Sequence, residues 1–346
     1  MNVKKVVSIS AVVIVSILIV YGFVLITQIF SDNTKFSEKE LYVYVPTGSD
    51  YDQVKKIIAP YVKHMDRFEM VAGKTSYPEN VKPGRFLFKK GMSSYDLVRT
   101  MKVNDPVRLA FNNQERLENF AGRVGSQLEP DSLELLNTFR DSVFLKENGF
   151  TEENVLVMFI PNTYEIYWNT SAEKFRDKMI KEYRNFWNKE RTAKAAAQGL
   201  TPIQATILAS IVHKESVKKD ERPRIAGVYL NRMRLEMPLQ ADPTVIFAMK
   251  LKSNDFNQVI KRVFYNDLIM KHPYNTYVNI GLPPGPIAMP DITALEAVLN
   301  PEKHNYIYFC ASVDRFGYHE FAATLSEHNI NAKKYSDWIN NQGVQR

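Results

Sequence analysis

One carboxylic acid in an apolar helical segment is the side chain of this sequence best suited to chemistry. At about 100° per residue, Glu215 projects close to the middle of a stripe formed by Ile203, Ile207, Leu208, Ile211 and Val212. Burial disfavours the charged form of a carboxyl group, so we expect a raised pKa for Glu215 and the ability to donate a proton near neutral pH. The pattern also fits a glutamate that pairs with Arg or Lys, or one that faces solvent.

Three polar clusters downstream contain side chains that suit a carbohydrate. They are NRM at 231–233, LQADPT at 239–244 and YNTY at 274–277. Their amide and hydroxyl groups both donate and accept hydrogen bonds, as sugar hydroxyl and acetamido groups require, and tyrosine rings can stack on sugar faces. Each cluster also has a plain structural explanation, with Asp242 as a helix cap before Pro243 and Arg232 as a surface charge.

A run rich in proline and glycine follows the last cluster. The sequence GLPPGPI at 281–287 resists both helix and sheet pairing. We therefore expect an exposed loop with few conformations, which would form a rigid wall of a groove. A mere connection between two elements is the alternative.

Helix signals position these residues. Thr201 is expected as the N-cap of the Glu215 helix, with Pro202 in the first helical position and Gln204 completing a capping box. Further elements are expected as a strand at 106–113, helices at 117–128, 131–145, 172–194 and 222–235, and a strand that buries Cys310.

The region before residue 106 is predicted to form a small α/β module. Its expected elements are a strand at 41–46, a helix at 50–63 that Pro60 breaks or kinks, a turn and strand at 82–88, and a helix capped by Ser93 or Ser94.

The N-terminus has the length and composition of a membrane span. Val6–Phe30 contains 25 residues without a charge, and such a helix is about 37 Å long, which exceeds a hydrocarbon core of ~30 Å. A signal peptide normally has a shorter apolar region and a small-x-small cleavage site, which we do not see. Because Lys4 and Lys5 precede the segment, we expect the N-terminus to stay in the cytoplasm and the rest to be exported.

Composition excludes several classes of site. The 346 residues, 45% hydrophobic and 24% charged, are typical of a globular protein of two or three domains. Cys310 is the only cysteine, so neither an intramolecular disulfide nor a Cys-based zinc site can form. His213 and Glu215 lack a His-Glu-x-x-His pattern, so no metal is expected. The net charge of +7 is scattered and shows no platform for nucleic acid.

Ordered motifs over most of the chain resemble one family. ASIVHKES, AGVYLNRM, MPLQADPTVIFAM, YNTYVNIGLPPGPIAMP and HEFAATLSEHN are similar to the successive motifs of the MltG (YceG-like) endolytic murein transglycosylases, and IPNTYEIYW resembles their entry motif. Upstream, KPGRFLFKKGMSSYDLVRTM resembles the LysM-like subdomain of these proteins. The segment 107–152 matches only loosely.

The resemblance implies an α+β protein with a single N-terminal transmembrane helix, a small LysM-like α/β subdomain and a mixed α+β catalytic domain. The expected boundaries are a cytoplasmic tail at 1–5, the transmembrane helix at 6–30, a stalk at 31–40, the LysM-like subdomain at 41–105, a connecting segment at 106–153 and the YceG-like catalytic domain at 154–346.

The resemblance also implies an activity. Members cut peptidoglycan strands internally between MurNAc and GlcNAc without hydrolysis and leave 1,6-anhydro-MurNAc ends, with Glu215 as the single general acid and base and with no cofactor. The residues implied to bind the glycan are Asn231, Arg232, Gln240, Asp242, Thr244, Tyr274, Asn275, Thr276, Tyr277, Gly281, Pro283, Pro284 and His319. Expected partners are peptidoglycan, the inner membrane and penicillin-binding proteins, whose strand elongation such an enzyme could terminate.

One position departs from the family pattern. Many members have Glu-Lys-Glu where this chain has His213, Lys214 and Glu215. Residue 213 lies away from the apolar stripe, so we expect the substitution to leave the acid unaffected and to change only contacts at the rim.

Two other functions stay open. A glycoside hydrolase would use Glu215 with Asp242 as a second carboxylate, ~5–5.5 Å apart for retention or ~6.5–9.5 Å for inversion. A non-catalytic protein could bind glycan and recruit cell-wall synthases, although such a scaffold does not need an acid on an apolar face.

Overall fold

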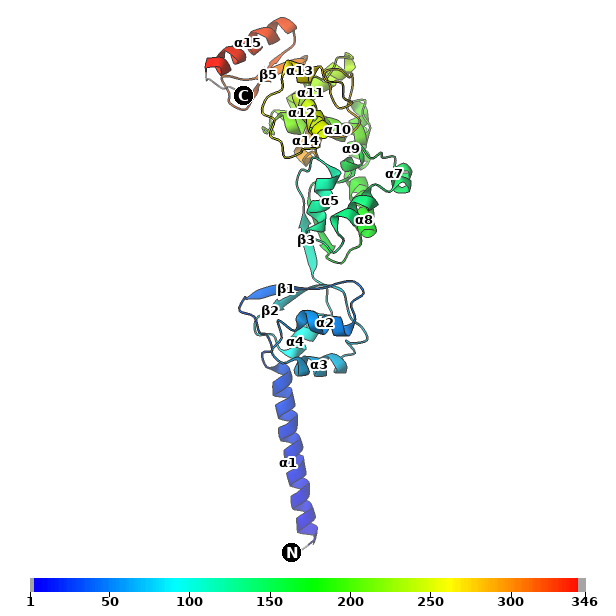
Figure 1. Cartoon of the computed structure of the whole chain (residues 1–346), viewed down its shortest axis with the longest axis vertical. Helices are drawn as coiled ribbons and strands as arrows, with labels where there is room; N and C mark the ends of the chain where they lie inside the picture. Colours follow the sequence, from blue (N-terminus) through cyan, green and yellow to red (C-terminus); the bar gives the residue numbers. More distant parts are fainter. Residues whose placement is uncertain (1–2, 342–346) are drawn as a thin grey trace. The chain divides into compact units, whose positions relative to one another are not determined.

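The structure is a computed structural model that describes residues 3–341 (Figure 1). It has a mixed α+β fold with an apolar N-terminal helix, as the sequence predicts. The chain divides into two compact units. One holds residues up to Leu109 together with Gln127–Pro130 and Tyr164–Ser171, and the other holds the remainder.

Helix α1 (Val3–Phe30) confirms the predicted apolar helix. Its part Ile9–Phe30 is long and apolar enough to cross a membrane, and its side chains are largely exposed. A membrane span and a signal sequence both have this character. Of the predicted tail, residues 1–2 lie outside the described residues and residues 3–5 begin α1.

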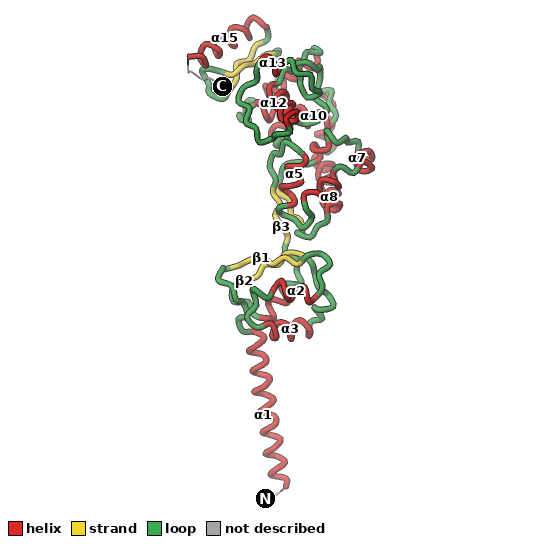
Figure 2. The backbone as a smooth tube through the Cα atoms, in the orientation of Figure 1, coloured by secondary structure: helices red, strands yellow, loops and turns green. Residues whose placement is uncertain are grey.

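The first unit is built on an antiparallel pair of strands. β1 (Glu40–Val45) pairs with β2 (Gly84–Lys89) from Glu40 opposite Lys89 to Val45 opposite Gly84. Helices α2 (Tyr51–Ile58), α3 (Met65–Lys74) and α4 (Ser94–Thr100) lie on one face of this pair, as Figure 2 shows. Side chains such as Val45, Phe86 and Phe88 are fully buried there because alternate strand residues point to the same face.

The first unit differs from the sequence prediction in two places. Helix α2 ends at Ile58, before Pro60, and a further helix, α3, follows that the sequence did not predict. The first residues of the expected stalk at 31–40 belong to the folded unit. Asn33 and Thr34 are buried; the Asn33 side chain donates to Ser94 Oγ, and Thr34 forms a β-bridge with Val62. Only its later residues are mostly exposed.

Short helices packed around aromatic rings form the first part of the second unit. They are α5 (Leu117–Gly125), α6 (Ser132–Phe139), α7 (Ser142–Asn148), the 3-10 helix η1 (Val155–Met158), α8 (Ala172–Phe186) and α9 (Lys189–Ala197). The predicted helix at 131–145 is two helices, because Asp141 caps α7. The predicted helix at 172–194 also divides, because Asn188 caps α9. Strand β3 (Pro106–Ala110) pairs with β4 (Thr163–Tyr167), and all but one residue of each strand belongs to the first unit.

The remaining elements surround one central helix. α10 (Pro202–Glu215) lies among α11 (Arg222–Arg234), α12 (Asp242–Ser253) and α14 (Ile292–Leu299) in Figure 1. The chain continues through α13 (Tyr265–Leu268), before α14, and then through the antiparallel strands β5 (Tyr308–Ala311) and β6 (His319–Ala322) to α15 (Leu325–Asn341). Cys310 is half-buried in β5 rather than fully buried, because this small sheet has only two strands.

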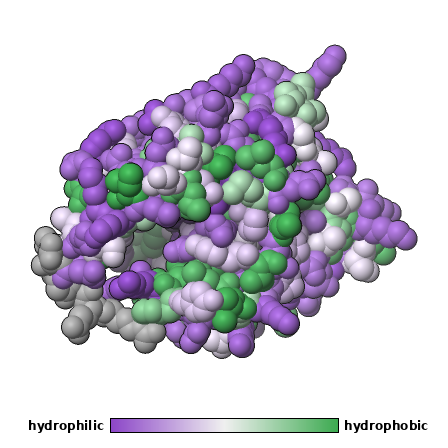
Figure 3. Space-filling view, turned by 90° about the horizontal axis from the view of Figure 1, so that it is seen from above, coloured by the Kyte–Doolittle hydropathy of each residue, from purple (hydrophilic) through white to green (hydrophobic). Residues whose placement is uncertain are grey.

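The surface mixes polar and apolar residues. On the face drawn in Figure 3, hydrophobic patches lie between hydrophilic residues, and a hollow opens among them. A mixed surface of this kind is typical of a globular chain that keeps most charges in contact with solvent.

Candidate active site

Glu215 is the last residue of the central helix. The start of α10 follows the prediction, because the Thr201 side chain accepts a hydrogen bond from the Gln204 backbone and the Gln204 side chain returns one. Burial extends beyond the predicted apolar stripe of this helix: residues 205–212 are all buried, so this part of α10 is enclosed on every side. Glu215, at the C-terminal end of this helix, therefore lies where the buried core meets the surface of the unit.

The carboxyl group of Glu215 has a raised pKa. Glu215 is half-buried, and burial among protein atoms raises its pKa to about 7. A positive charge on His319 and a hydrogen bond from Tyr229 act in the opposite direction, and the charge of Asp242 adds to the increase. The Tyr229 hydroxyl donates to Glu215 Oε2 at 3.0 Å. The net result is an acid that is substantially protonated near neutral pH, as the sequence predicts.

Asp242 forms a second polar group near this acid. The N-cap of α12 is Ala241, so Asp242 is the first helical residue and its side chain does not cap the helix as expected. Instead, the Tyr277 hydroxyl donates to Asp242 Oδ1 at 2.5 Å. Burial and the negative charge of Asp242 raise the pKa of Tyr277, so its hydroxyl stays protonated and can donate.

Arg232 is buried rather than a surface charge. Its guanidinium donates to the Leu239 carbonyl at 2.7 Å and to Gln240 Oε1 at 2.7 Å, and it lies over the ring of Tyr308. Burial lowers the pKa of Arg232 from its ordinary value. Gln240 has a left-handed backbone with φ of 52°, which a non-glycine residue adopts only where its surroundings hold it. The pair fixes the turn that leads into Asp242.

Several residues implied to bind glycan serve as internal scaffold. Asn275 is fully buried and donates to the carbonyls of Leu268 and Met270. Thr244 and Thr276 are buried and share a hydrogen bond of 2.9 Å, which ties the start of α12 to the YNTY cluster. These side chains hold Asp242 and Tyr277 in place but do not themselves face solvent.

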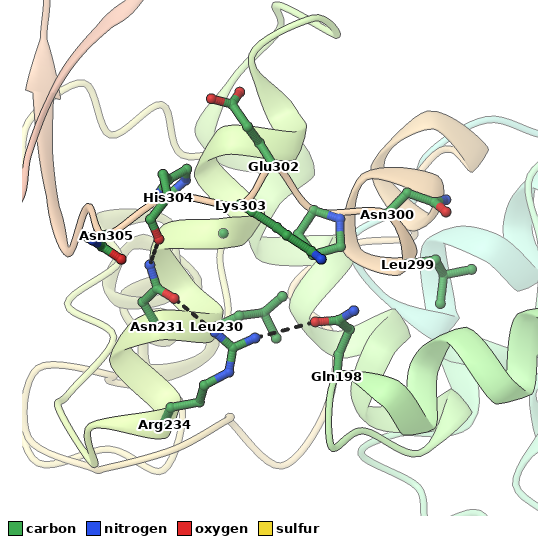
Figure 4. A pocket seen from close by; sticks show the side chains of 12 residues that line it. Gln198, Leu230, Asn231, Arg234, Leu299, Asn300, Glu302, Lys303, His304 and Asn305 are labelled. Atoms are coloured by element: carbon green, nitrogen blue, oxygen red, sulfur yellow. Dashed lines mark hydrogen bonds between the residues drawn. The ribbon is translucent and has the colours of Figure 1, made fainter.

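Tyr274 and Asn231 also have internal roles. Tyr274 packs against Phe247 with ring centroids 4.9 Å apart, and burial raises its pKa to about 12. Asn231 donates to the carbonyls of His304 and Tyr306. It lines a pocket of about 560 Å³ with Gln198, Arg234 and residues 299–305, which Figure 4 shows. Since Tyr229 and Arg232 project from the other face of α11, this pocket is separate from the Glu215 site.

The proline-rich run is buried over most of its length, which corrects the expected exposed loop. Pro283 and residues 285–290 are buried, while Pro284 is exposed and Gly281 is half-buried in a left-handed conformation. The Ile287 backbone donates to Ser210 Oγ on α10 at 3.1 Å. The run packs against the Glu215 helix because its apolar residues complete the enclosure of α10.

The sequence did not single out Tyr229 or Glu221. Glu221 is 5% exposed, and its Oε2 accepts from His319 Nδ1 at 2.7 Å. Tyr229 lies in the AGVYLNRM segment, and Glu221 stands directly before the Arg-Pro start of α11. Helix spacing alone does not show that Tyr229 reaches the acid or that Glu221 reaches His319.

His213 is half-buried and joins a group of charged side chains. Its Nδ1 lies 3.4 Å from Asp291 Oδ2 and 3.3 Å from the Arg222 guanidinium. Arg222 in turn donates to both Asp291 oxygens, at 2.7 and 2.8 Å. Residue 213 therefore contacts a partly buried network in which only Arg222 is fully enclosed. Among the described residues, no group of three or more His, Cys, Asp or Glu is placed to hold a metal ion.

Comparison with known proteins gives consistent matches. The model of the YceG-like family matches residues 43–334. An endolytic murein transglycosylase of Bacillus subtilis is 36% identical over 203 residues, which cover 58% of this chain and 53% of that protein. One of Streptococcus pneumoniae (strain D39) is 28% identical over 332 residues, which cover 86% of this chain and 59% of that protein. This chain thus spans less than two thirds of the length of these relatives.

A solved structure matches as well. The crystal structure of a yceG-like protein from Listeria monocytogenes aligns with a TM-score of 0.55 and 28% sequence identity. The alignment covers 85% of this chain and 99% of that one. The similarity thus extends over most of the chain.

Proposed function

The chain belongs to the YceG-like family, and from this and the site we propose that it is an endolytic peptidoglycan lytic transglycosylase. The observation that carries the proposal is Glu215, whose pKa burial raises to about 7 at the end of the central helix. A carboxyl group with that pKa can both donate and accept a proton near neutral pH.

Glu215 would act twice in the proposed reaction. The protonated carboxyl gives its proton to the oxygen between MurNAc and GlcNAc, and the bond from that oxygen to MurNAc C1 breaks. The MurNAc 6-hydroxyl then bonds to C1, so no water is needed and the product carries a 1,6-anhydro ring. The carboxylate left on Glu215 can accept the proton that this hydroxyl loses. The hydrogen bond from Tyr229 stabilises that carboxylate between the two steps.

The exposed polar groups near the acid would orient the sugar. Asp242 and Gln240 are exposed, and the half-buried Tyr277 holds Asp242 through its hydroxyl. The buried threonines and Asn275 hold these groups in place, which limits their motion when substrate binds.

The proposal also covers where the protein is located and what it binds. We infer that α1 is a single-pass anchor in the inner membrane, with the N-terminus in the cytoplasm and both units outside it. The unit on β1 and β2 is proposed as a LysM-like subdomain that binds glycan. An enzyme placed there could terminate strands made by penicillin-binding proteins.

A hydrolase is the second candidate, because the charge of Asp242 acts on Glu215. In that case Asp242 would activate a water molecule and the products would carry reducing ends. The hydrogen bond from Tyr277 disfavours this role, since it already occupies one oxygen of the carboxylate that would have to accept a proton from water.

The test uses the full chain in detergent, purified peptidoglycan and mass spectrometry of the products. We expect muropeptides with anhydro ends from the wild type and none from Glu215→Gln. Glu147→Gln, which changes an exposed glutamate on α7, serves as the matched control and should be fully active. Reducing ends would replace the proposal by hydrolysis, and no product from any variant would favour a glycan-binding scaffold.

A further inference from the structure

We propose that Glu221 and His319 form a carboxylate–imidazole pair that accepts the proton of the attacking hydroxyl in place of the Glu215 carboxylate, so that Glu215 acts only as the acid and the second of the two steps given to it above passes to His319. This inference rests on the proposed transglycosylase function. It assigns to His319 a base role, beyond the glycan binding expected of it, and it gives Glu221 a role as a positioning residue.

The pair has the geometry of an oriented base. His319 Nδ1 lies 2.7 Å from Glu221 Oε2, and the His319 backbone N–H donates to Glu221 Oε1 at 2.8 Å. Both carboxylate oxygens are therefore occupied by one residue 98 positions away in the chain. Because Glu221 is 5% exposed, the pair is fixed from the protein side and the histidine ring has little freedom to turn.

Contacts on two sides place the Glu221–His319 pair close to Glu215. Tyr229 donates to Glu215 at 3.0 Å and packs edge-on against Phe309, with ring centroids 5.8 Å apart. Phe309 packs edge-on against His319 at 5.1 Å. On the other side, the hydroxyl of Ser216, the residue after Glu215, donates to Glu221 Oε2 at 3.4 Å.

The hydrogen bonds decide which ring nitrogen is available. A carboxylate only accepts hydrogen bonds, so Nδ1 must carry the hydrogen that it gives to Glu221. In the neutral ring Nε2 then has a free lone pair, and in the part of the chain that the structure describes no hydrogen bond to Nε2 is present. His319 is half-buried, so this nitrogen can meet a substrate.

The proton transfers balance as follows. Glu215 gives its proton to the leaving oxygen as the bond from that oxygen to C1 breaks. In the closing step the bond between O6 and C1 forms, the O6–H bond breaks and its proton moves to His319 Nε2. Glu221 stabilises the imidazolium through the hydrogen bond from Nδ1. His319 then releases one proton to water and Glu215 takes one up, which restores both groups.

Chemical rescue tests the role of the ring. We expect His319→Ala in the full chain to lower the rate of anhydro-end formation by about 100-fold or more, and added imidazole to restore a large part of it. Glu221→Gln should also lower the rate, but imidazole should not restore it because His319 is still present. The control is His64→Ala, which changes an exposed histidine of the first unit. It should form anhydro ends at the wild-type rate both with and without imidazole.

The outcomes separate this inference from the proposed function. If His319→Ala makes anhydro ends at the wild-type rate, or loses activity that imidazole does not restore while thermal unfolding stays unchanged, Glu215 is the base and the inference is wrong. The function stands in both cases as long as Glu215→Gln is inactive. If the wild type makes reducing ends, the proposed function itself fails.

Discussion

At Glu215, one hydrogen bond opposes the effect of burial. The Tyr229 hydroxyl favours the carboxylate, whereas burial favours the neutral acid and determines the direction of the shift. An acid tuned by two opposing effects can be shifted by removing one of them.

We predict that Tyr229→Phe raises the pKa of Glu215. Without the donated hydrogen bond the charged form loses support, so the alkaline limb of the pH–rate profile should move up by about one pH unit. The profile of kcat/KM for release of anhydro products measures this shift. Tyr265→Phe, on an exposed tyrosine of α13, is the control, and an unmoved alkaline limb in Tyr229→Phe would contradict the prediction.

Glu215 should also lower the stability of the fold at alkaline pH. Its pKa is about 7 in the folded protein against 4.5 as the ordinary value, so the folded state binds the proton more tightly. The resulting stabilisation is complete below pH 4.5 and is lost as the pH rises through 7. We predict that Glu215→Gln unfolds at a higher temperature than the wild type at pH 8, with a gain of up to ~3 kcal/mol.

Thermal unfolding at pH 4.5 and pH 8 checks this prediction. The difference between variant and wild type should be small at the lower pH and large at the higher one. A difference independent of pH would show that packing of the amide, rather than removal of a buried charge, accounts for the change.

At the scale of elements, Arg222 ties the end of α10 to α14. Arg222 is 3% exposed and donates to the Ser216 carbonyl at 3.0 Å as well as to both oxygens of Asp291. Removing Arg222 takes these hydrogen bonds from the half-buried Asp291 carboxylate and from the Ser216 carbonyl. We predict that Arg222→Met lowers the free energy of unfolding by ~1.5–3 kcal/mol.

The neighbouring Arg224 offers a matched control for that prediction. It forms a more exposed ion pair with Glu302 at 3.0 Å, so Arg224→Met should cost less than about 1 kcal/mol. Urea unfolding of both variants gives the comparison. Equal losses would mean that the network around Arg222 contributes no more than a surface pair.

The proline-rich run depends on one glycine for its packing. A Cβ atom on Gly285 would lie 1.9 Å from the Glu153 carbonyl oxygen and 2.8 Å from the Tyr274 hydroxyl. We predict that Gly285→Ala destabilises the protein by ~1–3 kcal/mol, because the backbone must move. Gly122→Ala on α5 has open space around the new atom and should be neutral or slightly stabilising in the same thermal measurement.

At the scale of the whole molecule, the first unit includes residues immediately after α1. Asn33 is fully buried, donates to the His64 carbonyl and to Ser94 Oγ at 2.9 Å each, and accepts from the His64 backbone at 2.6 Å. A chain that begins at Ser31 keeps these bonds and should fold without detergent, whereas one that begins at Phe36 loses them.

We predict a loss of about 3 kcal/mol or more in the first unit of the shorter chain. Hydrogen exchange resolves the effect by unit: amides of β1 and α4 should exchange faster, and those of α10 should not change. Equal protection of β1 in both chains would show that residues 31–35 do not contribute to this unit.

Local signals in the sequence determined much of this protein. The capping box at Thr201, the break before Pro60 and the uncharged run before Asp32 each act over a few residues, so neighbouring side chains were sufficient to predict them. The raised pKa of Glu215 was also predictable, because the apolar pattern of its own helix indicated that the carboxyl group would be buried.

The tertiary structure alone decided how the acid is surrounded. Glu221 meets His319 across 98 positions, and the YNTY cluster is largely buried against α12 rather than open to solvent. Likewise, the proline-rich run completes the core around α10 instead of forming an exposed wall. Contacts of this kind depend on how distant elements pack together, and spacing along the chain does not specify which polar groups packing will bury as scaffold and which it will leave beside the acid.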